Sequence, residues 1–195
     1  MVRLRSHPKY SQFRFDAGSL ALNLVATVRH RGSQPRDLLV TPDALATWLK
    51  IIGLSESPFH VSVEDLDDAL YLREAIFRTV HDLILSNVPN SDDIKLLNET
   101  ARLSVAIPQL LMNSYSVNWE ASHPVKACLA AIARDAIIVI GHAERQRLKM
   151  CNDNGCMMLF MDTSPANHRR WCSMSICGNR KKVSLHRQQK KPLTV

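Results

Sequence analysis

The chain has 195 residues, of which 46% are hydrophobic and 22% charged, so it can build one main core and little more. These proportions exclude an intrinsically disordered or collagen-like chain. The longest apolar runs, such as 136–140, are far shorter than the roughly 18 residues that a membrane span requires. Residues 1–16 are basic and polar and contain no apolar stretch typical of a secretory signal. We therefore expect a cytoplasmic protein that makes no contact with a membrane.

The net charge of +7 is concentrated at the C-terminal end of the chain. Residues 1–149 contain 17 lysines and arginines against 16 acidic residues, whereas residues 150–195 contain 8 against 2. A small basic segment attached to a nearly neutral body is typical of a protein that binds a polyanion, most often nucleic acid. A basic tail that only improves solubility is the alternative explanation.

Four of the five cysteines lie in the same basic segment, as two C-x4-C pairs separated by fifteen residues. The four residues are Cys151, Cys156, Cys172 and Cys177. A segment of about 45 residues buries too little apolar surface to fold unaided. In a reducing compartment the expected staple is one structural zinc ion, which accepts four thiolates tetrahedrally. A disulfide staple, or His168 or His186 in place of one cysteine, are the alternatives, and we expect Cys128 to be a buried core thiol.

The apolar spacing upstream of these cysteines predicts a mainly helical region. Hydroxyl side chains precede two of the helices as N-caps, at Thr41 and at Ser62, where Asp65 completes a capping box. The spacing of the N-terminal apolar residues also fits a strand, but we favour a helix there. The expected helices span about 20–28, 41–53, 62–86, 91–103 and 124–145.

The remaining segments predict short strands. Two apolar stretches around a polar turn indicate a small hairpin within 105–120. Residues 157–161 and 169–172 are expected to pair as a second hairpin between the two cysteine pairs. Gly178 is expected to adopt a positive φ and to lead into a basic helix. The predicted fold class is therefore α+β, with a mainly helical domain over 1–148 and a treble-clef-like four-cysteine module over 149–195.

The segment that ends in Cys177-Gly178-Asn179-Arg180 resembles the CGNR zinc finger family, which is named for that tetrapeptide. Asp162-Thr163-Ser164 and Arg169-Arg170-Trp171-Cys172 also match that family. The upstream region is similar to the ABATE domain of bacterial stress-induced transcription regulators, through residues 17–22, 41–49, 72–75, 97–98 and 131–136. Where that family tends to show Leu-Asp-Phe-Val-Asn-Thr, this chain has Asn23 and Ala26 at the second and fifth positions. The resemblance implies that the zinc module binds DNA and that the protein controls transcription.

The candidate nucleic-acid contacts are the cationic and amide side chains of the basic segment. Cations that neutralise phosphates release counterions, whereas only side chains such as Asn179 and Arg180 have donors suited to reading bases. The predicted contacts are Arg169, Arg170, Asn179, Arg180, Lys181, Lys182, Arg187 and Lys190. As an alternative, some of these arginines balance the formal charge of −2 on a zinc ion with four thiolates, and Arg180 pairs with Asp162.

We expect a homodimer whose two zinc modules contact two half-sites on DNA, while the helical domain dimerises or senses a small-molecule effector. RNA binding and a protein-interaction adaptor are the alternatives. An enzyme is not expected, because the sequence has no glycine-rich phosphate loop, no nucleophile and base at motif spacing, and no metal-ligand set with an open position.

Overall fold

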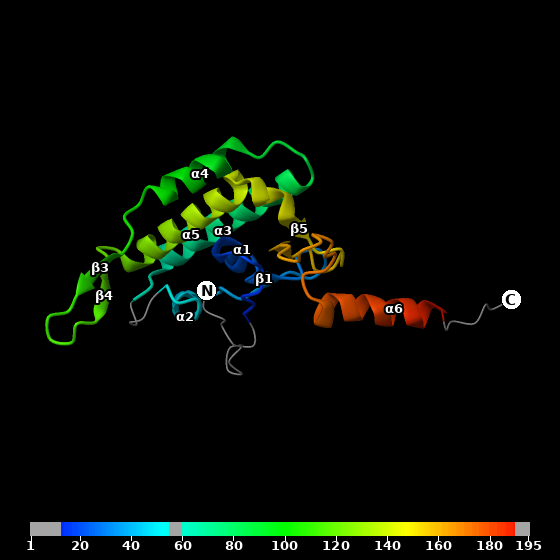
Figure 1. Cartoon of the computed structure of the whole chain (residues 1–195), viewed down its shortest axis with the longest axis horizontal. Coiled ribbons are helices and arrows are strands. Elements are labelled where there is room, and N and C mark those ends of the chain that lie inside the picture. The colour runs from blue at the N-terminus through cyan, green and yellow to red at the C-terminus, as the bar shows by residue number, and fades with distance from the viewer. Residues whose placement is uncertain (1–12, 55–59, 190–195) are drawn as a thin grey trace.

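The computed structural model describes residues 13–54 and 60–189. Its helices are α1 (Leu20–Val25), α2 (Pro42–Ile51), α3 (Val63–Ile84), α4 (Ser91–Ala101), α5 (Pro124–Gly141) and α6 (Asn179–Gln189). Helices α3, α4 and α5 pack side by side, and α1 lies against α3 and α5 (Figure 1). Each helix predicted in the first 145 residues is present. Among the residues described, no helix combines the length and apolar character needed to cross a membrane.

The predicted N-caps begin these helices. The hydroxyl of Thr41 accepts a hydrogen bond from the first turn of α2, and Ser62 with Asp65 forms a complete capping box at α3. The hydroxyl of Ser19 accepts the N–H of Leu22 at 3.1 Å, so residues 20–25 are a helix and not a strand. Local hydrogen bonding thus determines where each of these helices starts.

Helix α5 ends at Gly141, before the predicted end near residue 145. His142 takes an extended backbone, and its Nδ1 accepts the N–H of Glu144 at 3.4 Å. This bond begins a 3-10 helix, η2 (Ala143–Arg147). The prediction of a continuous helix was wrong because glycine disfavours the helix where the next residue can cap a new turn.

The strands form three separate antiparallel pairs. They are β1 (Val28–Arg29) with β2 (Arg36–Asp37), β3 (Ile107–Leu110) with β4 (Val117–Glu120), and β5 (Leu148–Met150) with β6 (Leu159–Met161). The β3–β4 pair confirms the hairpin predicted within 105–120. The predicted return strand over 169–172 is wrong, because β6 pairs with residues that precede Cys151. The N–H of Arg169 instead donates to the carboxylate of Asp162 at 2.8 Å.

The cysteine-bearing segment packs into the same hydrophobic core as the helices. Leu159 and Phe160 of β6 are fully buried and belong to one cluster with Trp48 of α2. Met158 is also buried there, and the N–H of Met161 donates to a carbonyl oxygen of the segment before α1 at 2.8 Å. The segment before α1 and the cysteine-bearing segment therefore share one core.

A buried arginine on α3 anchors the β1–β2 pair. Arg73 donates to both carboxylate oxygens of Asp37, at 2.7 and 2.6 Å, and to the hydroxyl of Thr27 at 3.2 Å. The neighbouring Glu74 accepts two hydrogen bonds from Arg31, at 2.8 and 2.9 Å. Burial alone would raise the pKa of Glu74, but the two arginines lower it below its ordinary value.

The turn between β1 and β2 contacts the cysteine-bearing segment at Gly32. A β-carbon on Gly32 would lie 1.8 Å from the carbonyl oxygen of Asn154 and 2.9 Å from the side chain of Met157. Beside it, the hydroxyl of Ser33 donates to the carbonyl oxygen of Gly155 at 3.1 Å. Only glycine permits this close approach of two backbones.

We predict that Gly32→Ala lowers the free energy of unfolding by about 1–3 kcal/mol, because the turn and the segment must separate to admit the methyl group. Gly141→Ala is the matched control, since a β-carbon there meets no atom within 4 Å. Urea unfolding of the zinc-loaded chain, followed by circular dichroism, measures both. Equal stabilities for the two variants would contradict the contact.

Candidate metal centre

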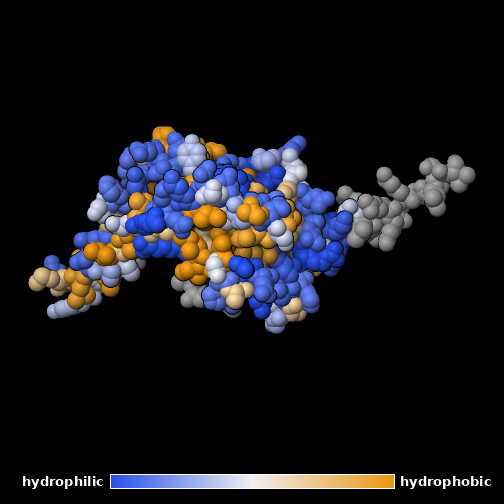
Figure 2. Space-filling model, turned by 90° about the horizontal axis from the view of Figure 1, so that it is seen from above, coloured by the Kyte–Doolittle hydropathy of each residue, from blue (hydrophilic) through white to orange (hydrophobic). Residues whose placement is uncertain are grey.

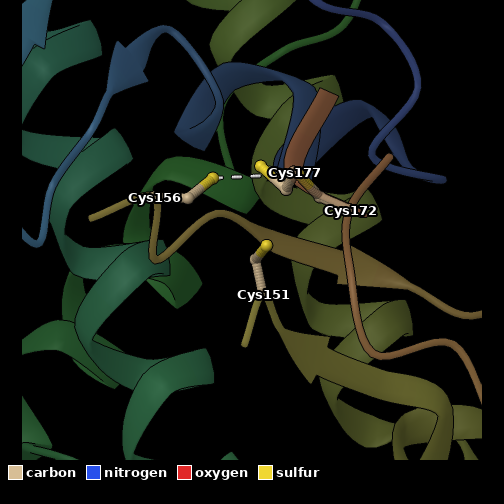
Figure 3. A group of neighbouring side chains, drawn as sticks. All are labelled: Cys151, Cys156, Cys172 and Cys177. Atoms are coloured by element: carbon tan, nitrogen blue, oxygen red, sulfur yellow. Dashed lines mark hydrogen bonds between the residues drawn. The ribbon is translucent and has the colours of Figure 1, made fainter. Parts of the chain in front are cut away.

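The four predicted ligands converge from separate parts of the C-terminal segment. Cys151 directly follows β5, Cys156 lies in the next turn, Cys172 is on a loop, and Cys177 belongs to the π-helical turn η3 (Met174–Gly178) before α6. All four are buried, and their Sγ atoms lie within 4.8 Å of one another. Their side chains point toward a common centre (Figure 3).

The spacing of the sulfurs fits a tetrahedral zinc ion. Zn–S bonds of about 2.3 Å place neighbouring sulfurs about 3.8 Å apart. The Sγ of Cys172 lies 3.7 Å from that of Cys156 and 3.7 Å from that of Cys177. All four cysteines are free thiols and His168 is exposed, so neither the disulfide nor a His168 ligand is seen; the side chain of His186 lies outside the described residues. The cluster could hold one zinc ion, and four sulfur ligands leave no open position for a substrate.

Asp153 shapes the turn between the first two cysteines. Its backbone carbonyl accepts the N–H of Cys156 at 2.8 Å, and its carboxylate accepts the N–H of Gly155 at 3.1 Å. From the start of α6, Arg180 donates to the same carboxylate at 3.1 Å. Asp153 therefore links the two cysteine pairs, and the predicted pairing of Arg180 with Asp162 is wrong.

Asp162 instead organises the loop between the cysteine pairs. Its buried carboxylate accepts the hydroxyl and N–H of Ser164, at 2.7 and 3.0 Å, and the N–H of Arg169. The ammonium group of Lys149 lies 3.6 Å away. Burial alone would raise the pKa of Asp162, but these bonds and this charge hold it far below its usual range. The carboxylate is already saturated by its own loop and leaves no place for Arg180.

Gly178 has a packing role and not the predicted conformational one. It ends η3 and passes directly into α6, and its φ is not positive. A β-carbon on it would lie 3.0 Å from the sulfur of Met174. The prediction failed because the chain continues from one helical turn into the next, so no left-handed residue is needed after Cys177.

Arg14, in the segment before α1, reaches the sulfur cluster. It is 9% exposed, and its guanidinium donates to the Sγ of Cys172 at 3.2 Å and to Asp16 at 2.8 Å. Burial alone would lower the pKa of Arg14, but Asp16 and Cys172 raise it above its ordinary value. Hydrogen bonds from Cys151 and Cys156, followed by the charge of Arg14, hold the pKa of the Cys172 thiol far below its usual range. Arg14 thus stabilises negative charge on this sulfur.

Arginines from both the N-terminal part of the chain and the zinc module lie near the cluster. Arg29 of β1 lines a small cleft together with Arg14, Cys156 and Cys177. Of the tail arginines, Arg169 donates to the carbonyl oxygen of Cys172 at 2.8 Å. The contact of Arg14 could not be predicted from the sequence, because 158 positions separate it from Cys172 and no motif spans that distance.

The other predicted nucleic-acid contacts lie on or near α6. Asn179, Lys181 and Lys182 are exposed at its first turn. Arg187 lies in α6, but its side chain is outside the described residues, as is the whole of Lys190. Before η3, the exposed Arg170 stacks over the ring of Trp171, with its guanidinium carbon 5.1 Å from the ring centroid.

The fifth cysteine is a core thiol, as predicted. Cys128 of α5 is buried and donates to the carbonyl oxygen of Leu54 at 3.4 Å. Burial raises the pKa of this thiol to about 11, so it is not a thiolate at neutral pH.

Comparison with known families agrees with this geometry. Residues 18–143 match the ABATE family, described as "putative stress-induced transcription regulator", and residues 147–190 match the CGNR zinc finger. The chain belongs to the ABATE family. The ABATE match ends and the CGNR match begins within η2. None of the curated proteins matches this chain.

Both positions at which this chain departs from the usual ABATE motif are buried. Asn23 is buried, and its side-chain oxygen accepts the N–H of Ala17 at 3.1 Å. It thereby fixes the segment that carries Arg14. Ala26 is buried among apolar side chains, and Thr27, which is unchanged, binds Arg73. The side chain of Asn23 therefore links α1 to the backbone of the segment before it.

We predict that Arg14→Met lowers the zinc affinity about 10–100-fold, because the thiolates lose a buried counter-charge and hydrogen-bond donor. Arg134→Met is the matched control, since Arg134 binds carbonyl oxygens at the far end of α4. Competition with a chelator of known affinity measures both. Wild-type affinity in Arg14→Met would show that the cluster does not need the charge and hydrogen bond of Arg14.

A second prediction concerns removal of zinc. Since the cysteines share the core of the helices, Cys172→Ser should lower the melting temperature of the whole chain by roughly 10 °C, as a loss of about 3 kcal/mol would do. Hydrogen exchange should show reduced protection in α1 as well as in β5 and β6. Cys128→Ser should keep the metal. Unchanged protection of α1 would instead show that the zinc module unfolds alone.

Proposed function

We propose that this protein is a DNA-binding transcription regulator in which the zinc module contacts DNA phosphates. The proposal includes a homodimer, so that two modules contact two half-sites, because one small module makes too few contacts to specify an operator. The helical domain would supply the dimer contacts or an effector site. No catalytic step is assigned to the chain.

The observation that carries the proposal is the unbalanced charge of α6. Both acidic residues of the segment 150–195 are engaged within the zinc module: Asp162 is fully buried, and Asp153 pairs with Arg180. Helix α6 itself contains four basic residues and no acidic one. Cations without neighbouring acids attract phosphates and release condensed counterions when they bind them.

The shape of the segment supports the same conclusion. Helix α6 projects from the body, and its first turn is attached to the metal centre through η3 and the Arg180–Asp153 pair (Figure 1). An α-helix with its side chains is about 10–12 Å wide, and the major groove of B-DNA is about 12 Å wide. The metal centre would thus fix the angle at which a basic helix meets the duplex.

The predicted contacts differ in how directly their substitution would test DNA binding. Arg169 and Arg180 have partners in the zinc module, so their substitution would disturb the metal site as well as any DNA contact. Lys181 and Lys182 are exposed and have no such structural role among the described contacts. They and Arg187 are the residues whose substitution tests DNA binding most directly.

We predict that the zinc-loaded protein binds duplex DNA with a steep dependence on salt. The triple variant Lys181→Ala/Lys182→Ala/Arg187→Ala should reduce the slope of log K against log salt by about one unit for each phosphate that it no longer neutralises. Fluorescence anisotropy of a labelled duplex across a salt series measures the slope. The variant should retain its zinc, because none of the three residues is a ligand of the cluster.

The matched control removes the same charge elsewhere, with Lys50→Ala/Lys95→Ala/Arg102→Ala on exposed positions of the helical domain. Equal losses of affinity in both triple variants would reduce the effect to net charge and contradict binding through α6. Stronger binding to structured RNA of equal length would favour the RNA alternative. Zinc binding without salt-dependent affinity for either nucleic acid would favour the adaptor.

A further inference from the structure

The β3–β4 hairpin projects from the helices at the end of the molecule opposite α6 (Figure 1). Its register pairs Pro108 with Trp119 and Leu110 with Val117. Paired residues of an antiparallel ribbon lie on the same face, and neighbours along a strand lie on opposite faces. One face is therefore entirely apolar, whereas the other carries Ile107, Gln109, Asn118 and Glu120.

The apolar face of the ribbon is not covered by the helices. The side chains of Leu110, Val117 and Trp119 are 67%, 53% and 57% exposed, and no residue of 107–120 belongs to the buried core. The tip adds Met112 and Tyr115, which are 88% and 82% exposed. Hydrophobic side chains gather on the projecting ribbon in Figure 2. Alternation of apolar and polar residues is typical of a strand with one buried face, yet here both faces meet solvent.

We propose that this apolar face and tip form the homodimer interface, in which the ribbon packs against the same ribbon of a second copy. This inference identifies the surface for the dimer of the proposed function, but it does not depend on DNA binding. A two-stranded ribbon alone is marginally stable in water, and a facing ribbon would supply the missing half of its core.

The low charge of the ribbon suits contact with a second copy. Residues 103–123 contain one charged side chain, Glu120, in a chain that is 22% charged. The segment has no lysine or arginine to bind nucleic acid, and no cluster of charge that would select a partner of the opposite sign. In a twofold dimer the same surface of each copy contacts its counterpart, so like charges would face and repel each other across the interface. An uncharged face avoids this repulsion.

The exposed apolar area is also sufficient for a stable pair. The apolar face and tip are formed by Leu110, Leu111, Met112, Tyr115, Val117 and Trp119. Scaled by their exposed fractions, these side chains present about 500 Å² per copy. Two copies would bury at most about 1,000 Å² from these side chains, and backbone and polar atoms would add to that area; about 1,000 Å² is the lower limit for a specific interface. The two α6 helices would stay free, since each projects from the opposite end of its copy.

Sedimentation of the zinc-loaded full chain tests the proposal. The wild type should be dimeric at micromolar concentration, and Leu110→Ser/Trp119→Ser should raise the dimer dissociation constant about 100-fold or more. The matched control is Gln109→Ser/Asn118→Ser, which alters the same two strands on the opposite face and should stay dimeric. Zinc content and circular dichroism should be unchanged in both variants, because these residues lie outside the core.

A wild-type chain that stays monomeric at about 100 µM would overturn the proposal, since the proposed interface is expected to hold a dimer at micromolar concentration. A dimer of unchanged affinity in Leu110→Ser/Trp119→Ser would overturn it as well. The two proposals fail separately, because DNA binding is read from the salt slope. A ribbon-dependent dimer without affinity for DNA would leave this inference standing and remove the proposed function.

Discussion

The negative charge gathered by four buried cysteines is the constraint on which the rest of this structure depends. Four thiolates with one zinc ion carry a formal charge of −2, and charge of that size in an apolar surrounding requires nearby cations. Arg14 supplies part of that positive charge by donating to Cys172, while Asp16 fixes the other edge of its guanidinium. The contact joins the first described residues to the last module and makes the metal centre part of the whole fold.

The zinc module is therefore less independent than its size and composition suggest. Its strand β6 fills the core beside α1 and α3, and backbone contacts at Gly18 and Gly32 leave no room for a side chain. A segment this small cannot bury enough apolar surface by itself. It gains stability from the metal and also from docking on the helical domain.

Much of this arrangement could be predicted from the sequence, because the information was local. The caps at Thr41 and Ser62 determine where two helices begin to within one turn. The two C-x4-C pairs predict a cluster of four ligands, because the loop between the pairs can bring them together. Two local predictions failed, at the end of α5 and at Gly178, and the other errors concern choices between distant partners. Strand β6 could pair with residues on either side of it, and the cysteine spacing favoured the later ones. Arg180 had two aspartates within reach, and Asp153 was left available because Ser164 and Arg169 already saturate Asp162.

Surface groups that have no partner within the folded chain indicate what kind of molecule the chain binds. At one end, the acidic residues of the zinc module are engaged by their own surroundings, and Lys181 and Lys182 of α6 are exposed to solvent. At the other, an apolar ribbon face lies outside the core in a stretch almost free of charge. Because α6 and the ribbon lie at opposite ends of the molecule, both surfaces could be occupied at the same time. Since the ribbon is joined to α4 and α5 while Arg14 ties the zinc module to α1, the rigid helices between them would fix the separation of two zinc modules in a dimer.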